Sequence, residues 1–272
     1  MASANFLFWN LGKLPRAELV SELVCERDID VVILAEGEES QVSLMESLSK
    51  RTMRRYELVP RVGTRIHTYA RSDSVQVVPI YEELSFHLSM YRVTMKDESI
   101  LLGAVHLPSK LHRDSSEQLL FATQVARDIR RVESEQACNR TVLCGDFNMN
   151  PFEPGMVAAR GFHSVMSRDI ADRRSRTISR QQFDFFYNPM WSQFGDRSAG
   201  PPGTYYSSRA GEIEYFWNTF DQVLVRSLLS SSFSSRIEVI VAIGDRTLLN
   251  SNGRPDRKVG SDHLPLAFTI TL

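Results

Sequence analysis

The sequence has few cysteines, no long apolar run and almost no excess charge. Its three cysteines, Cys25, Cys138 and Cys144, match no zinc-site spacing, and a low, odd count is typical of a reducing compartment. No apolar run approaches the ~20 residues that a membrane helix needs. The N-terminus lacks the basic and apolar regions of a signal peptide. These absences argue against zinc-binding and membrane-spanning classes and predict a cytoplasmic location.

The balance of charge limits the partners that the chain can bind. Lys and Arg number 32 and Asp and Glu number 33, so the net charge is −1. A near-neutral protein does not coat a polyanion by bulk charge, so any binding to nucleic acid must come from local patches. The 272 residues, 42% of them hydrophobic, allow one large α/β domain or two small ones.

Strands and helices are expected to alternate along the chain. The expected strands cover residues 6–10, 31–35, two or three shorter segments within 56–80, 91–95, 100–105, 141–144, 222–225, 237–242 and 264–270. The expected helices cover 15–27, 41–53 and 115–133, the last capped by Ser115 or Ser116. Between residues 150 and 220 the pattern weakens, and a long irregular stretch of this kind is usually functional. Strands of both kinds with a few helices indicate a layered α/β domain.

The strongest chemical signal is Gly145-Asp146-Phe147-Asn148, directly after the expected strand 141–144. Asp146 and Asn148 are two residues apart at a strand end, so both side chains can face the same side. A carboxylate beside a carboxamide can orient a water molecule and a phosphate oxygen together. The alternative is an Asx turn, because Asp and Asn favour turns. The tetrapeptide alone supports both interpretations equally.

The second signal is Gly260-Ser261-Asp262-His263-Leu264-Pro265, just before the last expected strand. An Asp next to a His at a strand end can supply a metal ligand and a proton-carrying group. A capping Asp beside a surface His is the simpler alternative.

Four further polar residues lie at strand ends: Asn10, Glu36, His106 and Asp221. Each has an ordinary interpretation as a turn, cap or solvated residue. Together with the two motifs, however, they place hard oxygen ligands and imidazoles at six strand ends, where sites form in open α/β sheets. Without a candidate Ser or Cys nucleophile, this set is typical of metal-assisted phosphoester hydrolysis.

This ordered set resembles the endonuclease/exonuclease/phosphatase superfamily, which includes proteins like deoxyribonuclease I and exonuclease III. The resemblance runs from Trp9-Asn10 to Ser261-Asp262-His263 and so covers nearly the whole chain. It implies one domain over residues 1–272 with a four-layered α/β/β/α sandwich of two mixed sheets. It also implies a phosphodiester hydrolase that uses Mg²⁺ or Mn²⁺.

The resemblance assigns a metal site to Asn10, Glu36 and Asp262, with Glu36 as the principal ligand. Carboxylate and carboxamide oxygens are the ligands that Mg²⁺ prefers. One departure from the family pattern lies next to this site, since Ala35 stands where the family usually has Gln before the Glu.

The resemblance also assigns catalytic roles. His106 contacts the scissile phosphate, Asp146 activates or orients the attacking water, and Asn148 positions phosphate and nucleophile. Asp221 and His263 form a pair in which the carboxylate fixes the tautomer and orientation of the imidazole, which then meets the phosphate.

The residues around Asp221 depart from the motifs of several members of the family. Many members carry an Arg shortly before this Asp, where the present chain reads Trp217-Asn218-Thr219-Phe220. Gln222 stands where abasic-site endonucleases have Tyr, and the Trp-Thr-Asp-Arg element of inositol-polyphosphate 5-phosphatases is missing before this strand. Two other motifs, Asn148-Met149-Asn150-Pro151-Phe152 and Gly203-Thr204-Tyr205-Tyr206, resemble uncharacterised bacterial members rather than any named enzyme.

A nuclease acting on DNA or RNA is the first substrate hypothesis. The basic segment 168–180, and within it Arg173, Arg174 and Arg176, is predicted to bind a phosphate backbone. Aromatic residues of the irregular stretch could stack on bases. Burial in the core is the favoured alternative for these aromatics, because such side chains usually supply buried area.

Two other hypotheses stay open. The net charge of −1 slightly favours a phosphoesterase acting on a nucleotide, another small molecule or a phospholipid head group. A binding module with a relict site is the third, and it is disfavoured because every expected catalytic residue type is present. The choice between DNA and RNA, strandedness, endo- or exonucleolytic action and oligomeric state are open.

Overall fold

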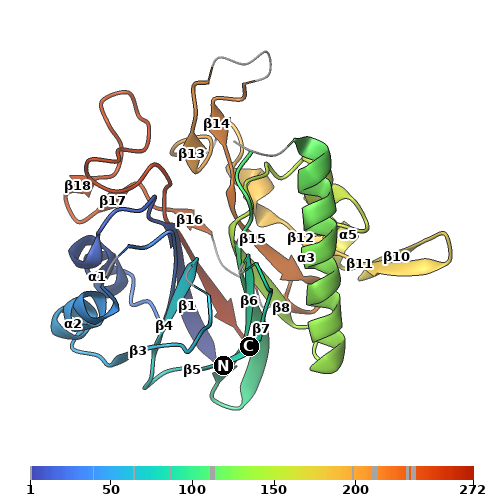
Figure 1. Cartoon of the computed structure of the whole chain (residues 1–272), viewed down its shortest axis with the longest axis horizontal. Coiled ribbons are helices and arrows are strands. Elements are labelled where there is room, and N and C mark those ends of the chain that lie inside the picture. The colour runs from blue at the N-terminus through green and yellow to red at the C-terminus, as the bar shows by residue number, and fades with distance from the viewer. Residues whose placement is uncertain are drawn as a thin grey trace.

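Two mixed β-sheets lie face to face in the computed structural model, with helices on both outer surfaces (Figure 1). The structure describes residues 2–38, 40–63, 65–85, 87–110, 114–197, 199–209, 214–230, 233 and 237–272. Helices α1 (Ala17–Glu26) and α2 (Gln41–Thr52) cover one sheet, and α3 (Ser115–Glu135) covers the other. The predicted four-layered α/β/β/α sandwich is confirmed.

The first sheet has six strands in the order β16-β19-β1-β2-β4-β3. Their bounds are β1 Ser3–Asn10, β2 Val31–Ala35, β3 Tyr56–Leu58, β4 Ile66–Arg71, β16 Glu238–Val239 and β19 Leu266–Thr271. The second sheet has seven strands in the order β5-β6-β7-β8-β15-β12-β9. Their bounds are β5 Gln76–Glu82, β6 Leu88–Met95, β7 Glu98–His106, β8 Thr141–Asp146, β9 Ser164–Val165, β12 Phe186–Tyr187 and β15 Asp221–Arg226.

Three short two-stranded ribbons and four short helices lie outside the two sheets and the three long helices. The ribbons pair β10 Ser175–Ile178 with β11 Gln181–Asp184, β13 Tyr205–Tyr206 with β14 Trp217–Asn218, and β17 Ala242–Ile243 with β18 Arg246–Thr247. The helices are α4 Pro154–Val157, α5 Arg168–Ala171, η1 Pro189–Gln193 and η2 Ser227–Leu229. Most of these elements fall in the stretch 150–220, where the sequence pattern weakens.

Strand β1 shows why both faces of each sheet are buried. Phe6 and Phe8 point into the layer between the sheets, where Phe6 stacks on Phe268 with ring centroids 5.0 Å apart. Leu7 and Trp9 point the other way and pack with the residues of α1 and α2. Side chains alternate along a strand, so a continuous apolar run fills two apolar layers at once.

The strand register brings the polar strand ends together. β7 runs parallel to β8 with His106 opposite Asp146, and β15 runs antiparallel to β8 with Asp221 opposite Asp146. In the other sheet, β1 and β2 are parallel with Asn10 opposite Ala35, which places Glu36 one residue further on at the same edge. The site therefore forms at one end of the sandwich.

Several predicted boundaries are wrong. Asp114, rather than Ser115 or Ser116, caps α3, because its carboxylate accepts from the backbone of Ser116 and Glu117 at 2.8 Å each. The strand predicted over 237–242 is only Glu238–Val239, since Ala242 already belongs to the β17–β18 ribbon. The last strand begins at Leu266 instead of Leu264.

The aromatics of the irregular stretch divide between two environments. Phe183, Phe185 and Phe186 are buried, which confirms the core interpretation for them. Trp191 and Tyr205 are only half-buried and face cavities. Among the described residues, no helix combines the length and apolarity needed to cross a bilayer.

Candidate active site

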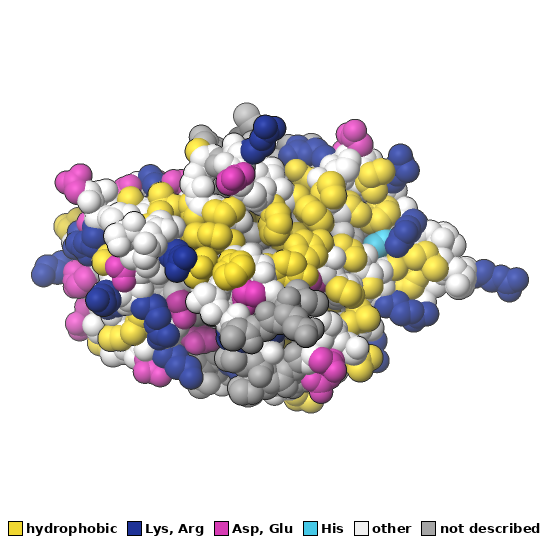
Figure 2. Space-filling model, turned by 90° about the horizontal axis from the view of Figure 1, so that it is seen from above, with side chains coloured by type: hydrophobic (Ala, Val, Ile, Leu, Met, Phe, Trp, Pro, Cys, Tyr) yellow, Lys and Arg dark blue, Asp and Glu magenta, His cyan; other side chains and the backbone are white. Residues whose placement is uncertain are grey.

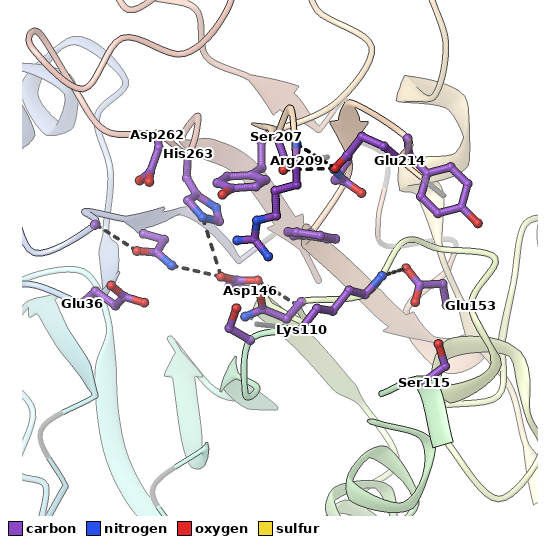
Figure 3. A pocket seen from close by; sticks show the side chains of 18 of the residues that line it. Glu36, Lys110, Ser115, Asp146, Glu153, Ser207, Arg209, Glu214, Asp262 and His263 are labelled. Carbon is purple, nitrogen blue, oxygen red and sulfur yellow. Dashed lines mark hydrogen bonds and ion pairs between the residues drawn. The ribbon is translucent and has the colours of Figure 1, made fainter. Parts of the chain in front are cut away.

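A cavity of about 980 Å³ opens between the two sheets at the edge where the polar strand ends meet (Figure 3). Six of the eight predicted metal and catalytic residues line it: Asn10, Glu36, Asp146, Asn148, Asp262 and His263. The other two, His106 and Asp221, lie directly behind and contact Glu36 and His263, respectively. The structure thus brings all eight together, and their individual roles stay predictions.

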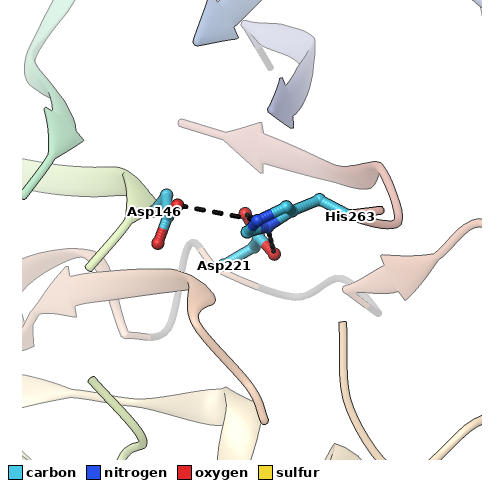
Figure 4. A group of neighbouring side chains, drawn as sticks. All are labelled: Asp146, Asp221 and His263. Atoms are coloured by element: carbon cyan, nitrogen blue, oxygen red, sulfur yellow. Dashed lines mark hydrogen bonds and ion pairs between the residues drawn. The ribbon is translucent and has the colours of Figure 1, made fainter. Parts of the chain in front are cut away.

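The floor of the cavity is a buried group of Asp146, Asp221 and His263 (Figure 4). Asp221 is fully buried, and its Oδ2 lies 2.8 Å from Nδ1 of His263. The other imidazole nitrogen, Nε2, lies 3.9 Å from Oδ2 of Asp146. The imidazole therefore stands between two carboxylates, with one ring nitrogen fixed by Asp221.

The carboxylates decide the charge of His263. Burial alone lowers the pKa of its imidazole, because it removes the charged form from water. The charge and hydrogen bond of Asp221, with the charges of Asp146 and Asp262, outweigh that effect and raise the pKa of His263 to about 10. Burial raises the pKa of Asp146, with Asp221 adding to the shift and His263 opposing it. The pair of Asp221 and His263 is thus a carboxylate–imidazolium pair.

The backbone around His263 is held by β1 and by the segment that enters the β13–β14 ribbon. The indole Nε1 of Trp9 donates to the carbonyl oxygen of His263 at 2.9 Å. The amide of Leu264 donates to the carbonyl of Thr204 at 2.9 Å, and the Tyr205 ring lies 4.6 Å from the imidazole, centroid to centroid. The indole of Trp9 therefore links the end of β1 to the segment just before β19.

Glu36 and His106 form a second pair, at the wall of the cavity. Nε2 of His106 lies 3.2 Å from Oε1 of Glu36. This hydrogen bond lowers the pKa of Glu36, against the opposing effect of burial. The carbonyl of His106 accepts from Nδ1 of His87 at 2.6 Å. His106 is thus fixed from behind and Glu36 is held ionised beside the cavity.

The Gly145–Asn148 motif is both a turn and part of the site. The Asn148 amide donates to Oδ1 of Asp146 at 2.8 Å, which is the Asx-turn geometry. Nδ2 of Asn10 donates to Oδ2 of the same carboxylate at 3.0 Å. At Gly145, a Cβ would run into the carbonyl oxygen of Val105, so only glycine fits there. The two sequence interpretations were therefore compatible.

Two donor sets fit a divalent cation. The ligand atoms of Asp146, Asp221 and His263 lie within 4.8 Å of one another, a composition consistent with a divalent-metal site. Within this set, Asp221 and His263 are already hydrogen-bonded to each other. The side chains of Glu36 and Asp262, in contrast, remain 32% and 30% exposed at the cavity, beside Asn10. Oxygen ligands with exposed faces are what Mg²⁺ and Mn²⁺ require.

Several cavity residues were missed by the sequence interpretation. Lys110 reaches along the wall, where its Nζ is in close contact with Glu153 and lies 5.3 Å from the centre of the Phe220 ring. Arg209 extends from the opposite side, with its guanidinium directed toward the floor (Figure 3). A signal existed for Lys110, since it follows the His106 strand end by four residues. Arg209 carried no such signal.

The predicted substrate-binding arginines lie elsewhere. Arg173, Arg174 and Arg176 are exposed around α5 and β10, and none of them lines the catalytic cavity. Arg173 and Arg176 line a second groove, whereas Arg174 lines neither.

Comparisons with known proteins support the fold. No protein-family model matches the chain, and no curated protein matches it by sequence. Solved structures do match over the full length. An endonuclease/exonuclease/phosphatase family protein from Bacteroides thetaiotaomicron is 14% identical with a TM-score of 0.61, covering 98% of this chain and 97% of that one. TDP2 from D. rerio, complexed with a single-strand DNA product, is 16% identical with a TM-score of 0.59 and complete coverage of both chains.

The catalytic domain of human Nocturnin with a bound sulfate anion matches as well. It is 12% identical with a TM-score of 0.58, covering 99% of this chain and 94% of that one. The chain therefore has the fold of the endonuclease/exonuclease/phosphatase family, as its motifs predicted.

Proposed function

We propose that the protein is a divalent-metal-dependent phosphodiester hydrolase whose substrate is a nucleic acid. One observation carries the proposal: Asp221 fixes the buried His263 imidazole at 2.8 Å beside Asp146, on the floor of a cavity that Glu36 and Asp262 also line. A fixed cation, a buried carboxylate and exposed carboxylates in one cavity are the parts that phosphodiester hydrolysis needs.

We assign different roles in the reaction to His263 and Asp146. His263, protonated through its pairing with Asp221, donates from Nε2 to a phosphate oxygen as negative charge develops there. Asp146, held by Asn10 and the Asn148 amide, is placed to align a water molecule for in-line attack. These groups are held before substrate arrives, which lowers the reorganisation that the reaction requires.

Glu36, Asp262 and Asn10 are the residues that we assign to the metal. A divalent cation bound there supplies positive charge for the phosphate oxygens. The carboxylate of Asp262 also lies 3.5 Å from a guanidinium nitrogen of Arg257, which would compete with the cation for it. Among the described residues Glu36 pairs with His106 and forms no ion pair with a Lys or Arg, so it is the principal ligand in this proposal.

Four cationic residues support a polyanionic substrate: Lys13, Lys110, Arg209 and Arg257 line the catalytic cavity. Lys110 is paired with Glu153 and Arg257 with Asp262, and the net charge of the whole chain is −1. That low net charge supports the alternative, a phosphoesterase acting on a small molecule or a phospholipid head group. The proposed location of the protein is the cytoplasm.

A substrate panel tests the proposal. The protein is incubated with Mg²⁺ or Mn²⁺ and labelled single- and double-stranded DNA and RNA, with nucleotides and phosphoinositides beside them. Metal-dependent cleavage of at least one nucleic acid is expected. Turnover of only the small molecules would favour the alternative, and no turnover of any substrate would leave a binding module with a relict site.

A further inference from the structure

Four aromatic side chains gather beside the catalytic cavity, and Phe152 lies at their centre. Its ring centroid is 5.4 Å from that of Tyr215, 5.7 Å from that of Phe194 and 6.4 Å from that of Trp191. Tyr215 is 50% exposed and Phe194 is 38% exposed. Phe152 and Tyr215 both line the catalytic cavity. These aromatic faces therefore begin in the cavity and continue outside it.

The cluster leads into a second groove of about 630 Å³. Trp191 lines this groove and contacts Phe152, so it connects the two hollows. The groove floor includes Val157 and Met166, which are 39% and 59% exposed. Figure 2 shows hydrophobic side chains gathered across the middle of this face of the molecule, with Lys and Arg side chains at its edges. The surface is continuous and largely apolar between two charged ends.

The far end of the groove carries two guanidinium groups without acidic partners. Arg173 and Arg176 line it, and within the described part of the chain neither forms an ion pair with a carboxylate. Nε of Arg176 donates to Nε2 of His163 at 2.9 Å, which holds the guanidinium in place. Nδ1 of His163 is turned to the carbonyl of Asp184 at 3.1 Å. This arrangement leaves two positive charges available for an anionic ligand.

We infer that a single-stranded nucleic acid follows this surface, from the catalytic cavity across Phe152 and Trp191 to Arg173 and Arg176. Exposed rings interleaved with cations match a chain in which bases alternate with phosphates. A duplex fits less well, because its bases stack on each other and are not free to stack on side chains. The inference rests on the proposed function only in assigning the scissile phosphate to the catalytic cavity.

The path makes cleavage depend on substrate length. With Mg²⁺, a single-stranded octanucleotide of DNA or RNA should have a lower KM than a dinucleotide, because only the longer chain reaches Trp191 and the arginines. Trp191→Ala should raise the octanucleotide KM by about tenfold, as expected for losing base stacking. Trp191→Phe should restore most of the loss, which separates stacking from a folding defect. The dinucleotide KM should not change.

The arginines offer a matched control. Arg173→Ala with Arg176→Ala should raise the octanucleotide KM and reduce the slope of log affinity against log salt by about 1 to 2. Arg174→Ala with Arg180→Ala removes the same charge from the same segment, but neither residue lines the groove or the cavity. That control should leave both KM and the salt slope unchanged. Equal losses in the two double variants would overturn the path.

Binding measured without turnover separates the two proposals. In EDTA, fluorescence anisotropy should show that a labelled single-stranded octanucleotide binds the protein. Trp191→Ala should weaken this binding. A duplex and an acidic peptide should bind with lower affinity than the octanucleotide. This result would support the path even if no phosphodiester is ever cleaved, an outcome that would refute only the proposed function. Cleavage of dinucleotide and octanucleotide with the same KM would leave the proposed function intact and overturn the path.

Discussion

The floor and the rim of the catalytic cavity are built in opposite ways. On the floor, Asp146, Asp221 and His263 are 2%, 0% and 7% exposed, and the register of β8 and β15 places the two carboxylates opposite each other. On the rim, Lys110 and Arg209 extend from loops and keep solvent contact. Fixed buried groups suit chemistry that must not vary, whereas loop residues suit recognition that differs between proteins of one fold. Changes to the floor should therefore affect kcat, and changes to the rim should affect KM.

Removing the floor imidazole should have the largest effect. His263→Ala should lower kcat on the order of 10²-fold or more, as expected for losing an acid or a charge-stabilising group. Asp221→Asn should lower kcat strongly without unfolding the protein, because the imidazole loses the group that orients it. The two act as one unit, so the double variant should be little worse than His263→Ala alone.

Steady-state kinetics of both single variants and the double variant, with metal titrations beside them, measure this coupling. Neither change should weaken metal binding much, since Glu36 and Asp262 are assigned that role. Losses that multiply, or a metal affinity that collapses in Asp221→Asn, would show that Asp221 is a metal ligand. The group of Asp146, Asp221 and His263 would then be the metal site.

Glu36→Gln tests whether Glu36, which lies between the floor and the rim, is a metal ligand. The substitution keeps the shape of the side chain and removes one carboxylate, so the Mg²⁺ concentration for half-maximal activity should rise on the order of tenfold or more. A metal titration of activity measures it. The matched control is Glu38→Gln, an exposed carboxylate two residues away that does not line the cavity. An unchanged metal requirement in Glu36→Gln would remove Glu36 from the metal site.

The sequence predicts the floor better than the rim, for a physical reason. Strand ends are visible in sequence, because an apolar run stops at a polar residue, as Val31–Ala35 stops at Glu36. Once parallel strands are assigned to a sheet, the polar residues at their carboxyl ends share an edge. Even so, the contact of Asp146 with Asp221 depends on antiparallel pairing between strands 75 positions apart, which no local pattern contains.

The rim and the groove could not be predicted in the same way. The placement of Arg209, in a loop, and of Trp191, in η1, depends on tertiary packing rather than on periodicity. The basic segment 168–180 stood out by composition, but composition could not separate Arg173 and Arg176, which line the groove, from Arg174, which does not. The capping Asp114 was missed because the adjacent Ser115 and Ser116 are equally good cap residues in sequence.

A rim cation should have a smaller effect, confined to KM. Lys110→Met should raise the KM for nucleic acid a few-fold and leave kcat nearly unchanged, because a loop cation binds phosphate without taking part in the chemistry. Lys50→Met, on the exposed outer face of α2, is the matched control. If kcat falls in Lys110→Met as far as in His263→Ala, Lys110 acts on the transition state and belongs with the floor.

Two buried histidines differ in a way that affects stability rather than turnover. Burial lowers the pKa of His87 to about 4, since its nearest partner is the carbonyl of His106 and its charged neighbours Glu83 and Arg65 act in opposite directions. In His263 the carboxylates reverse that effect. The folded pKa of His87 lies below the ordinary value of 6.5, so its stability contribution is complete above pH 6.5 and is lost as the pH falls toward 4. The full contribution is at most about 3 kcal/mol.

Urea unfolding at a series of pH values measures this contribution. The free energy of unfolding should decrease between pH 6.5 and pH 4, and His87→Gln should make that decrease shallower. A profile that is the same in the variant and the wild type would mean that folding does not lower the pKa of His87. Burial alone would then not explain the difference between His87 and His263.

The most direct test of a metal-dependent phosphodiesterase uses bis(p-nitrophenyl) phosphate, which is too small to extend from the catalytic cavity to Trp191 and the second groove. Its turnover is measured for the wild type and His263→Ala, each with Mg²⁺ or Mn²⁺ and each with excess EDTA. Turnover by the wild type with metal, abolished by EDTA and reduced on the order of 10²-fold in His263→Ala, is the predicted result. Turnover that persists in EDTA, or that His263→Ala leaves unchanged, would contradict it.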